Sequence, residues 1–149
     1  MSAADVPNIP GHAAVLIARQ WLGTPYRHQA ATLGAGCDCL GLLRGVWRSL
    51  YGQEPEAIPN YSPDWSEPQG QERLMAAALL HLQRQTGADA SGDVLLFRMR
   101  AGSVAKHLGI AAQMGASPTF IHSYSGHGVV ESPLTSAWGR RIAARFVFP

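Results

Sequence analysis

Helical and strand-like segments occupy opposite ends of this chain, and that order constrains its fold more than any other feature. Before Gly87, apolar residues recur at helical spacing in residues 12–22, 39–51 and 72–85. After Gly92, short apolar segments separated by turn residues have the pattern of strands, at 93–99, 107–113, 119–124, 128–132 and 143–148. Helices followed by consecutive short strands predict an α+β fold, in which N-terminal helices pack on one face of a C-terminal antiparallel β-sheet.

The size and charge of the chain exclude several classes of protein. Its 149 residues, of which 46% are hydrophobic, suffice for one sizeable core, so we expect a single domain over residues 1–149. The net charge is only +2 and Lys106 is the sole lysine, which argues against a nucleic-acid partner. No run of about 20 apolar residues predicts a transmembrane segment. The N-terminus lacks the basic start of a signal peptide, so we expect no export signal.

Residues 53–71 differ in composition from the rest, with four prolines together with Tyr61 and Trp65. Proline interrupts helices and strands alike, so this segment predicts an irregular surface excursion. Its aromatic side chains could line a groove or dock a partner, and the sequence leaves this role open.

The segment GAGCDCLGLLRG, residues 34–45, contains both cysteines of the chain. A zinc site needs about four ligands and Cys-x-Cys supplies two, so no metal site is expected. A disulfide between Cys37 and Cys39 is expected to be strained. We interpret Cys37 as a loop residue packed against the sheet. The alternative is a redox partner that caps Cys39 reversibly.

Cys39 lies in the first turn of the predicted helix 39–51, and Asp38 occupies the N-cap position. The start of a helix is the positive end of its dipole and carries unpaired N–H donors. Both features favour the thiolate over the thiol, which is the condition for a nucleophile at neutral pH. A small buried hydrophobic residue is the alternative, and this segment alone does not distinguish the two.

His107 and His122 lie on consecutive predicted strands. If residues 114–117 form a four-residue hairpin loop, His122 lies opposite Gly109. His107 is two residues from Gly109 and on the same face, so the two histidines become diagonal neighbours, about 7–8 Å apart at Cα. Gly109 would leave room for both rings. Cysteine catalysis needs an imidazole that activates the thiol and a group that orients this imidazole.

Four motifs, in this order, resemble the NlpC/P60 family of papain-like cysteine peptidases: DCLGL (38–42), GDVLLF (92–97), KHLGIA (106–111) and FIHSY (120–124). The likeness extends from WLGTPYRHQ (21–29) to WGRRIAARFV (138–147), which is nearly the whole chain. The segments GCDCLGL and RGVW are similar to a subgroup of cell-wall peptidases carried by tailed phages and gene transfer agents.

The resemblance implies the papain-like NlpC/P60 fold and a thiol protease that hydrolyses amide bonds in peptidoglycan stem peptides. It implies Cys39 as nucleophile, His107 as general base and His122 as the residue that orients the base. Tyr26 matches a family tyrosine in the loop that lines the site. His28, close to Tyr26, is a further candidate for substrate binding. No metal or organic cofactor is implied.

The phage-like subgroup also implies partners and a location. The partners would be tail hub or baseplate proteins, in a particle made in the cytoplasm that acts in the periplasm or cell wall. Many members have Ser after the catalytic cysteine, where this chain has Leu40, and this departure concerns substrate details near the nucleophile. Two alternatives remain: a non-catalytic tail-hub adaptor on the same fold, or an amidase or acyltransferase with another substrate.

Overall fold

The computed structural model describes residues 9–55 and 70–149; most of the predicted excursion 53–71 lies outside them. The helices are α1 (Ile9–Gln20), α2 (Cys39–Tyr51), α3 (Arg73–His81) and α4 (Ser136–Gly139). The strands are β1 (Ala31–Thr32), β2 (Gly36–Cys37), β3 (Gln83–Arg84), β4 (Val94–Arg98), β5 (Ala105–Ala111), β6 (Thr119–Tyr124), β7 (Gly128–Pro133) and β8 (Ile142–Val147). Within the described residues, no helix is long and apolar enough to cross a bilayer.

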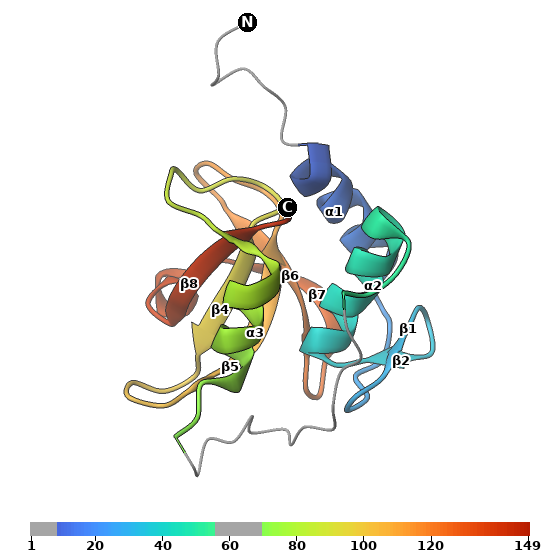
Figure 1. Ribbon diagram of the computed structural model, residues 1–149, viewed down its shortest axis with the longest axis horizontal. Coiled ribbons are helices and arrows are strands. Elements are labelled where there is room, and N and C mark those ends of the chain that lie inside the picture. The colour runs from blue at the N-terminus through green and yellow to red at the C-terminus, as the bar shows by residue number, and fades with distance from the viewer. Residues whose placement is uncertain (1–8, 56–69) are drawn as a thin grey trace, which may run out of the picture.

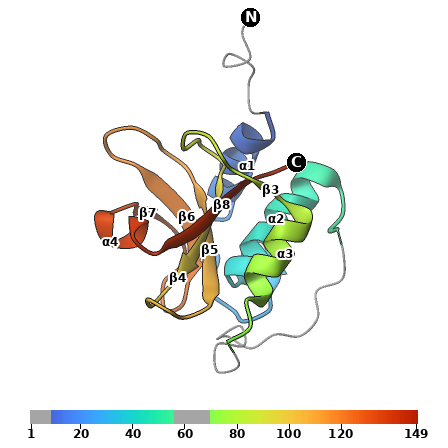
Figure 2. The same cartoon turned by 60° about the vertical axis from the view of Figure 1, so that its left-hand side comes forward.

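One antiparallel sheet, with strand order β3-β8-β4-β5-β6-β7, organises the molecule. Strands β4 to β7 follow one another as a meander, and β8 returns along the other edge of β4. Figures 1 and 2 show α1, α2 and α3 on one face of this sheet and α4 on the opposite face. The predicted α+β fold, with N-terminal helices on a C-terminal antiparallel sheet, is confirmed.

Two predicted segments differ from the structure. The helix expected over 72–85 ends at His81, and Leu82 is extended and buried. The next residues form β3, which pairs with β8, so core packing of Leu82 and strand pairing outweigh the helix propensity of this segment. The segment around Cys37, expected to be a loop, forms β2, which pairs with β1 as a small hairpin beside α2.

The two faces of the sheet carry unequal cores. On the helix side, buried residues of α1, α2 and α3 pack against Leu108 and its neighbours. On the other side, a smaller cluster includes Phe97 and Phe120, with Trp138 of α4 packed against it. Side chains alternate between the faces of a strand, and His107 pairs with Phe97 across β4 and β5. His107 is therefore on the face of the smaller cluster.

Gly45 determines how closely α1 and α2 approach each other. The Trp21 ring, which follows α1, lies directly on Gly45 of α2, and a Cβ at Gly45 would meet ring carbon Cζ2 at 2.0 Å. Trp21 is only 4% exposed, so its ring has little room to move away.

We expect Gly45→Ala to lower the stability of the protein. Overpacking costs about 1–3 kcal/mol, against the roughly 1 kcal/mol that Ala gains over Gly within a helix. With a buried ring in contact, we expect a net loss of about 1–2 kcal/mol in urea unfolding. Gly139→Ala is the matched control, because a Cβ there meets nothing within 4 Å. Equal stability of the two variants would contradict this account of the α1–α2 packing.

Candidate active site

Helix α2 begins at Cys39 because Asp38 caps it. Asp38 Oδ1 accepts a hydrogen bond from the Gly41 N–H at 2.7 Å, as an N-cap does. Its other oxygen, Oδ2, accepts from the Gln29 N–H at 2.7 Å. The carboxylate is only 3% exposed, so both bonds lie inside the protein. Asp38 therefore joins the start of α2 to the loop that precedes β1, and the predicted N-cap is confirmed.

Cys39 is held against strand β5. Its side chain is nearly buried, and Sγ lies 3.9 Å from the carbonyl oxygen of Lys106. The Leu108 N–H also points at this sulfur, together with the N–H groups of Cys39 and Leu40 at the helix start. The sulfur thus lies between the two peptide groups that flank His107.

His107 and His122 form a direct hydrogen bond, with His107 Nε2 and His122 Nδ1 2.8 Å apart. The strand register is the one predicted, because Ile110 pairs with Ile121 and this places His122 opposite Gly109. A Cβ at Gly109 would lie 2.8 Å from the Phe120 ring and 3.2 Å from His122 Cβ, so glycine provides the room expected of it.

Aromatic rings enclose the histidine pair. The Phe120 ring lies 4.2 Å from the His122 ring between centroids, and the Tyr124 ring lies 5.4 Å away. Trp138 of α4 contacts both histidines, with centroids 5.8 Å from His107 and 5.3 Å from His122. This enclosure leaves His107 7% exposed and His122 1% exposed. No sequence motif pointed to these aromatic residues as part of the site, although the alternation along β6 places residues 120, 122 and 124 on one face.

Cys39 and His107 open on the same cavity, which has a volume of about 180 Å³. The predicted binding residues Tyr26 and His28 line it as well, whereas His122 lies behind His107 and does not. The roles of all five residues remain predictions. The cavity has further lining residues that the sequence did not point to as a group: Asp38, Met99, Lys106, Ser123, Tyr124 and Ser125.

Tyr26 and His28 approach the helix start from the loop after α1. Burial, and after it the negative charges of Cys39 and Asp38, raise the pKa of Tyr26 to about 12. The Tyr26 hydroxyl is therefore a neutral hydrogen-bond donor in the cavity that Cys39 also lines. His28 Nδ1 lies 3.8 Å from Asp38 Oδ2, and the two form an ion pair when the imidazole is protonated. Tyr26 is half-buried, whereas His28 is exposed and reachable.

Burial controls the ionisation of the site. The N–H groups of Cys39, Leu40 and Leu108 lower the pKa of the Cys39 thiol, as the helix start led us to expect. Burial is the larger effect, however, and it raises that pKa to about 12. Burial likewise lowers the pKa of His107 to about 3 and that of His122 to about 4. Burial therefore opposes the thiolate that the helix start favours, and it shifts the site towards a neutral thiol beside a neutral imidazole.

Cys37 is a fully buried residue of β2, and both cysteines are free thiols. Its carbonyl oxygen accepts hydrogen bonds from the Ser123 hydroxyl at 2.7 Å and from the Arg27 N–H at 3.1 Å. Burial raises the pKa of Cys37 to about 11. Its backbone therefore ties the β1–β2 hairpin to β6. Cys37 is a strand residue and not the loop residue expected, but its buried side chain packs in the core as expected.

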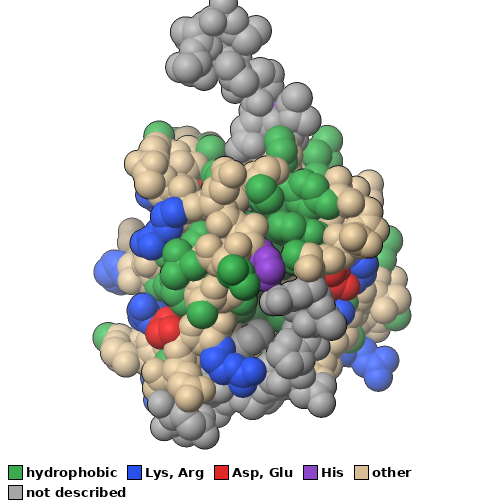
Figure 3. Space-filling view, in the orientation of Figure 1, with side chains coloured by type: hydrophobic (Ala, Val, Ile, Leu, Met, Phe, Trp, Pro, Cys, Tyr) green, Lys and Arg blue, Asp and Glu red, His purple; other side chains and the backbone are tan. Residues whose placement is uncertain are grey.

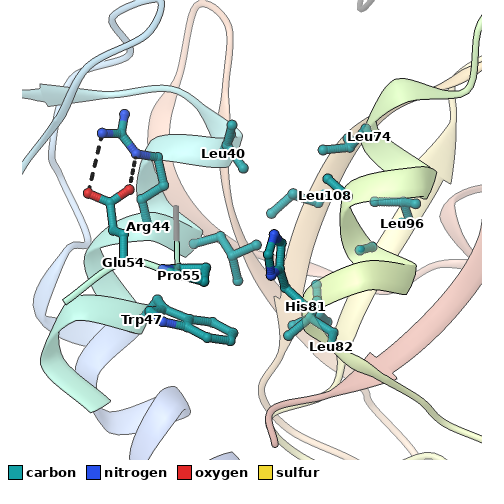
Figure 4. A pocket seen from close by; sticks show the side chains of 14 residues that line it. Leu40, Arg44, Trp47, Glu54, Pro55, Leu74, His81, Leu82, Leu96 and Leu108 are labelled. Atoms are coloured by element: carbon teal, nitrogen blue, oxygen red, sulfur yellow. Dashed lines mark hydrogen bonds and ion pairs between the residues drawn. The ribbon is translucent and has the colours of Figure 1, made fainter. Parts of the chain in front are cut away.

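A second cavity, of about 70 Å³, separates α2 from α3 (Figure 4). Figure 3 shows hydrophobic side chains gathered over this part of the molecule. Apart from the Arg44–Glu54 ion pair and His81, the walls are apolar, and they contain no cysteine. This cavity is therefore not the candidate active site. Among residues 9–55 and 70–149, no cluster of three His, Cys, Asp or Glu side chains could hold a metal ion.

The buried histidines make the stability of the protein depend on pH. Each has a folded pKa below its unfolded value of about 6.5, so the unfolded chain binds more protons as the pH falls. Stability is then complete above about pH 6.5 and is lost progressively as the pH falls, down to about pH 4 for the His122 contribution and about pH 3 for that of His107. We expect each histidine to remove about 2 kcal/mol between pH 7 and pH 5, measured by urea unfolding. His122→Gln should lose about half of this pH dependence; an unchanged dependence would contradict the burial argument.

Comparison with known proteins supports the fold. No protein-family model and no curated protein matches this sequence. Among solved structures, the NlpC/p60 domain of the peptidoglycan hydrolase SagA has a TM-score of 0.62 at 22% identity, over 93% of this chain and 98% of that one. An NLP/P60 family protein from Staphylococcus aureus, described as similar to lipoprotein, has a TM-score of 0.59 at 18% identity, over 99% of this chain.

An NlpC/P60 family protein from Bacillus cereus has a TM-score of 0.58 at 20% identity, over 91% of this chain. The chain spans 44% of the Staphylococcus protein and 39% of the Bacillus protein. The arrangement of helices and sheet around Cys39, His107 and His122 is therefore the NlpC/P60 fold.

Proposed function

We propose that this protein is an NlpC/P60 cysteine peptidase that hydrolyses amide bonds in peptidoglycan stem peptides. The observation that carries the proposal is that Cys39, at the start of α2, opens on the same cavity as His107, whose ring is hydrogen-bonded to His122. Three groups in this arrangement supply a nucleophile, a base and the residue that orients the base. The likeness in fold to a peptidoglycan hydrolase domain supports the choice of substrate.

Acylation begins with a neutral thiol. The Cys39 thiol gives its proton to His107 Nδ1, because His107 Nε2 is engaged by His122. The sulfur then bonds to the carbonyl carbon of the scissile amide, and the carbonyl oxygen becomes an oxyanion. Backbone N–H groups at the start of α2 and the Tyr26 hydroxyl are positioned at the same cavity wall to stabilise this charge.

Deacylation returns the site to its starting state. Before it, acylation is completed when the C–N bond breaks: the leaving amine takes the proton from His107, and the acyl half stays on Cys39 as a thioester. Water then gives a proton to His107 and adds to the thioester carbonyl. When the C–S bond breaks, the proton returns to the sulfur, and the products are an amine and a carboxylic acid.

The biological setting is proposed from the sequence resemblance. GCDCLGL and RGVW are similar to the cell-wall peptidases of tailed phages and gene transfer agents. We therefore place the enzyme in a particle tail, with tail hub or baseplate proteins as partners and the periplasm or cell wall as its site of action.

Digestion of purified peptidoglycan, with the products identified by mass spectrometry, tests this function. We expect the wild type and Cys37→Ala to release stem-peptide fragments at similar rates. Cys39→Ala should lower the rate at least 10³-fold, because removal of the nucleophile abolishes the thioester route. Cys37→Ala is the matched control, since both changes remove one buried thiol from the same segment.

Other outcomes would identify the alternatives. Loss of activity in Cys37→Ala, with the protein folded, would indicate thiol redox chemistry. Release of products from a different bond would indicate an amidase or acyltransferase. No release by the wild type, with Cys39 inert to iodoacetamide, would contradict the proposal and favour a non-catalytic tail-hub adaptor.

A further inference from the structure

Ser132 forms a hydrogen bond with His122 and so adds a third residue to the His107–His122 pair. Ser132 Oγ lies 2.9 Å from His122 Nε2, on the far side of the ring from His107. We propose that Ser132 is a positioning residue that holds His122 in the tautomer with its proton on Nε2. This inference rests on the proposed peptidase function, because it explains how His107 is kept ready to accept the proton of Cys39.

The sheet places the three residues in sequence across consecutive strands. On β6, His122 pairs with Val130 of β7, and Phe120 pairs with Ser132. Ser132 is therefore a diagonal neighbour of His122 on the same face, just as His122 is a diagonal neighbour of His107. The hydrogen bonds run from β5 through β6 to β7 without an intervening gap.

The chemistry of the proton transfer fixes the direction of each hydrogen bond. To accept a proton at Nδ1, neutral His107 must carry its own proton on Nε2. His107 Nε2–H then donates to His122 Nδ1, so that nitrogen must be unprotonated. The proton of neutral His122 is consequently on Nε2, where it donates to Ser132 Oγ.

The opposite set of tautomers would disable the site. If the Ser132 hydroxyl donated to His122 Nε2, His122 would carry its proton on Nδ1 and donate to His107 Nε2. His107 would then hold its proton on Nδ1, the nitrogen needed for the thiol proton. A tautomer lock at His122 therefore decides whether His107 can act as a base.

The surroundings give His122 little alternative to Ser132. His122 is 1% exposed, and its ring contacts those of Phe120, Tyr124 and Trp138, so little solvent reaches it. An N–H left unpaired in such a place costs about 1–3 kcal/mol. Removing the Ser132 hydroxyl therefore removes the acceptor that stabilises the productive tautomer.

Kinetics of two matched pairs test the role of the hydroxyl. The first pair is the wild type and Ser132→Ala, and the second is Ser132→Thr and Ser132→Val, whose side chains have the same shape. In each pair only the first protein has the hydroxyl. We expect Ala and Val to lower kcat on stem peptides about 10–100-fold with little change in KM, since Ser132 does not line the cavity. Thr should retain most of the activity. Thermal unfolding of each variant controls for loss of fold.

The tautomer of His122 can be observed directly without substrate. This measurement therefore tests the role of Ser132 even if the proposed peptidase function is wrong. Long-range proton–nitrogen NMR correlations of the histidine rings report which nitrogen carries the proton. We expect His122 to be protonated on Nε2 in the wild type and in Ser132→Thr, and to gain Nδ1 protonation in Ser132→Ala and Ser132→Val. A wild-type His122 protonated on Nδ1, or Ala and Val variants with unchanged tautomer and kcat, would overturn the inference.

Discussion

The arrangement of the site depends on the two hydrogen bonds that the buried Asp38 carboxylate accepts. This carboxylate accepts one backbone N–H from the first turn of α2 and another from Gln29 in the preceding loop. Gly41 allows this contact, because a Cβ there would lie 1.8 Å from the Ala30 carbonyl oxygen. These contacts fix both Cys39 and the loop that carries Tyr26. An uncapped α2 would leave Cys39 without a defined position relative to β5.

The second constraint is the exclusion of water from the His107–His122 pair. Trp138 and Phe120 exclude water from the histidine pair, and this burial keeps the imidazoles neutral by lowering their pKa values. In the proposed mechanism a neutral pair can still move a proton, because the oxyanion and the leaving amine supply the partners that the resting site lacks. Under the same proposal the tautomer of His122 is important, and this links a hydroxyl on β7 to a cysteine on α2.

Much of this arrangement could be predicted from the sequence. The helical period of 39–51 and the Asp38 cap located α2 correctly, and a four-residue loop correctly set the register that joins His107 to His122. Properties that depend on tertiary packing could not be predicted from the sequence. The sign of the Cys39 pKa shift depends on how deeply β5 buries the sulfur, and α3 ends early because Leu82 enters the core.

The central claim, that Cys39 is the acylated nucleophile, is tested most directly by trapping the thioester. Rapid mixing with purified stem peptides, an acid quench within milliseconds and peptide mapping by mass spectrometry would locate any acyl adduct. We expect the acyl half of the substrate on the peptide that contains Cys39, and no adduct in Cys39→Ala. Products formed without an adduct on Cys39, or an adduct on another residue, would contradict the account.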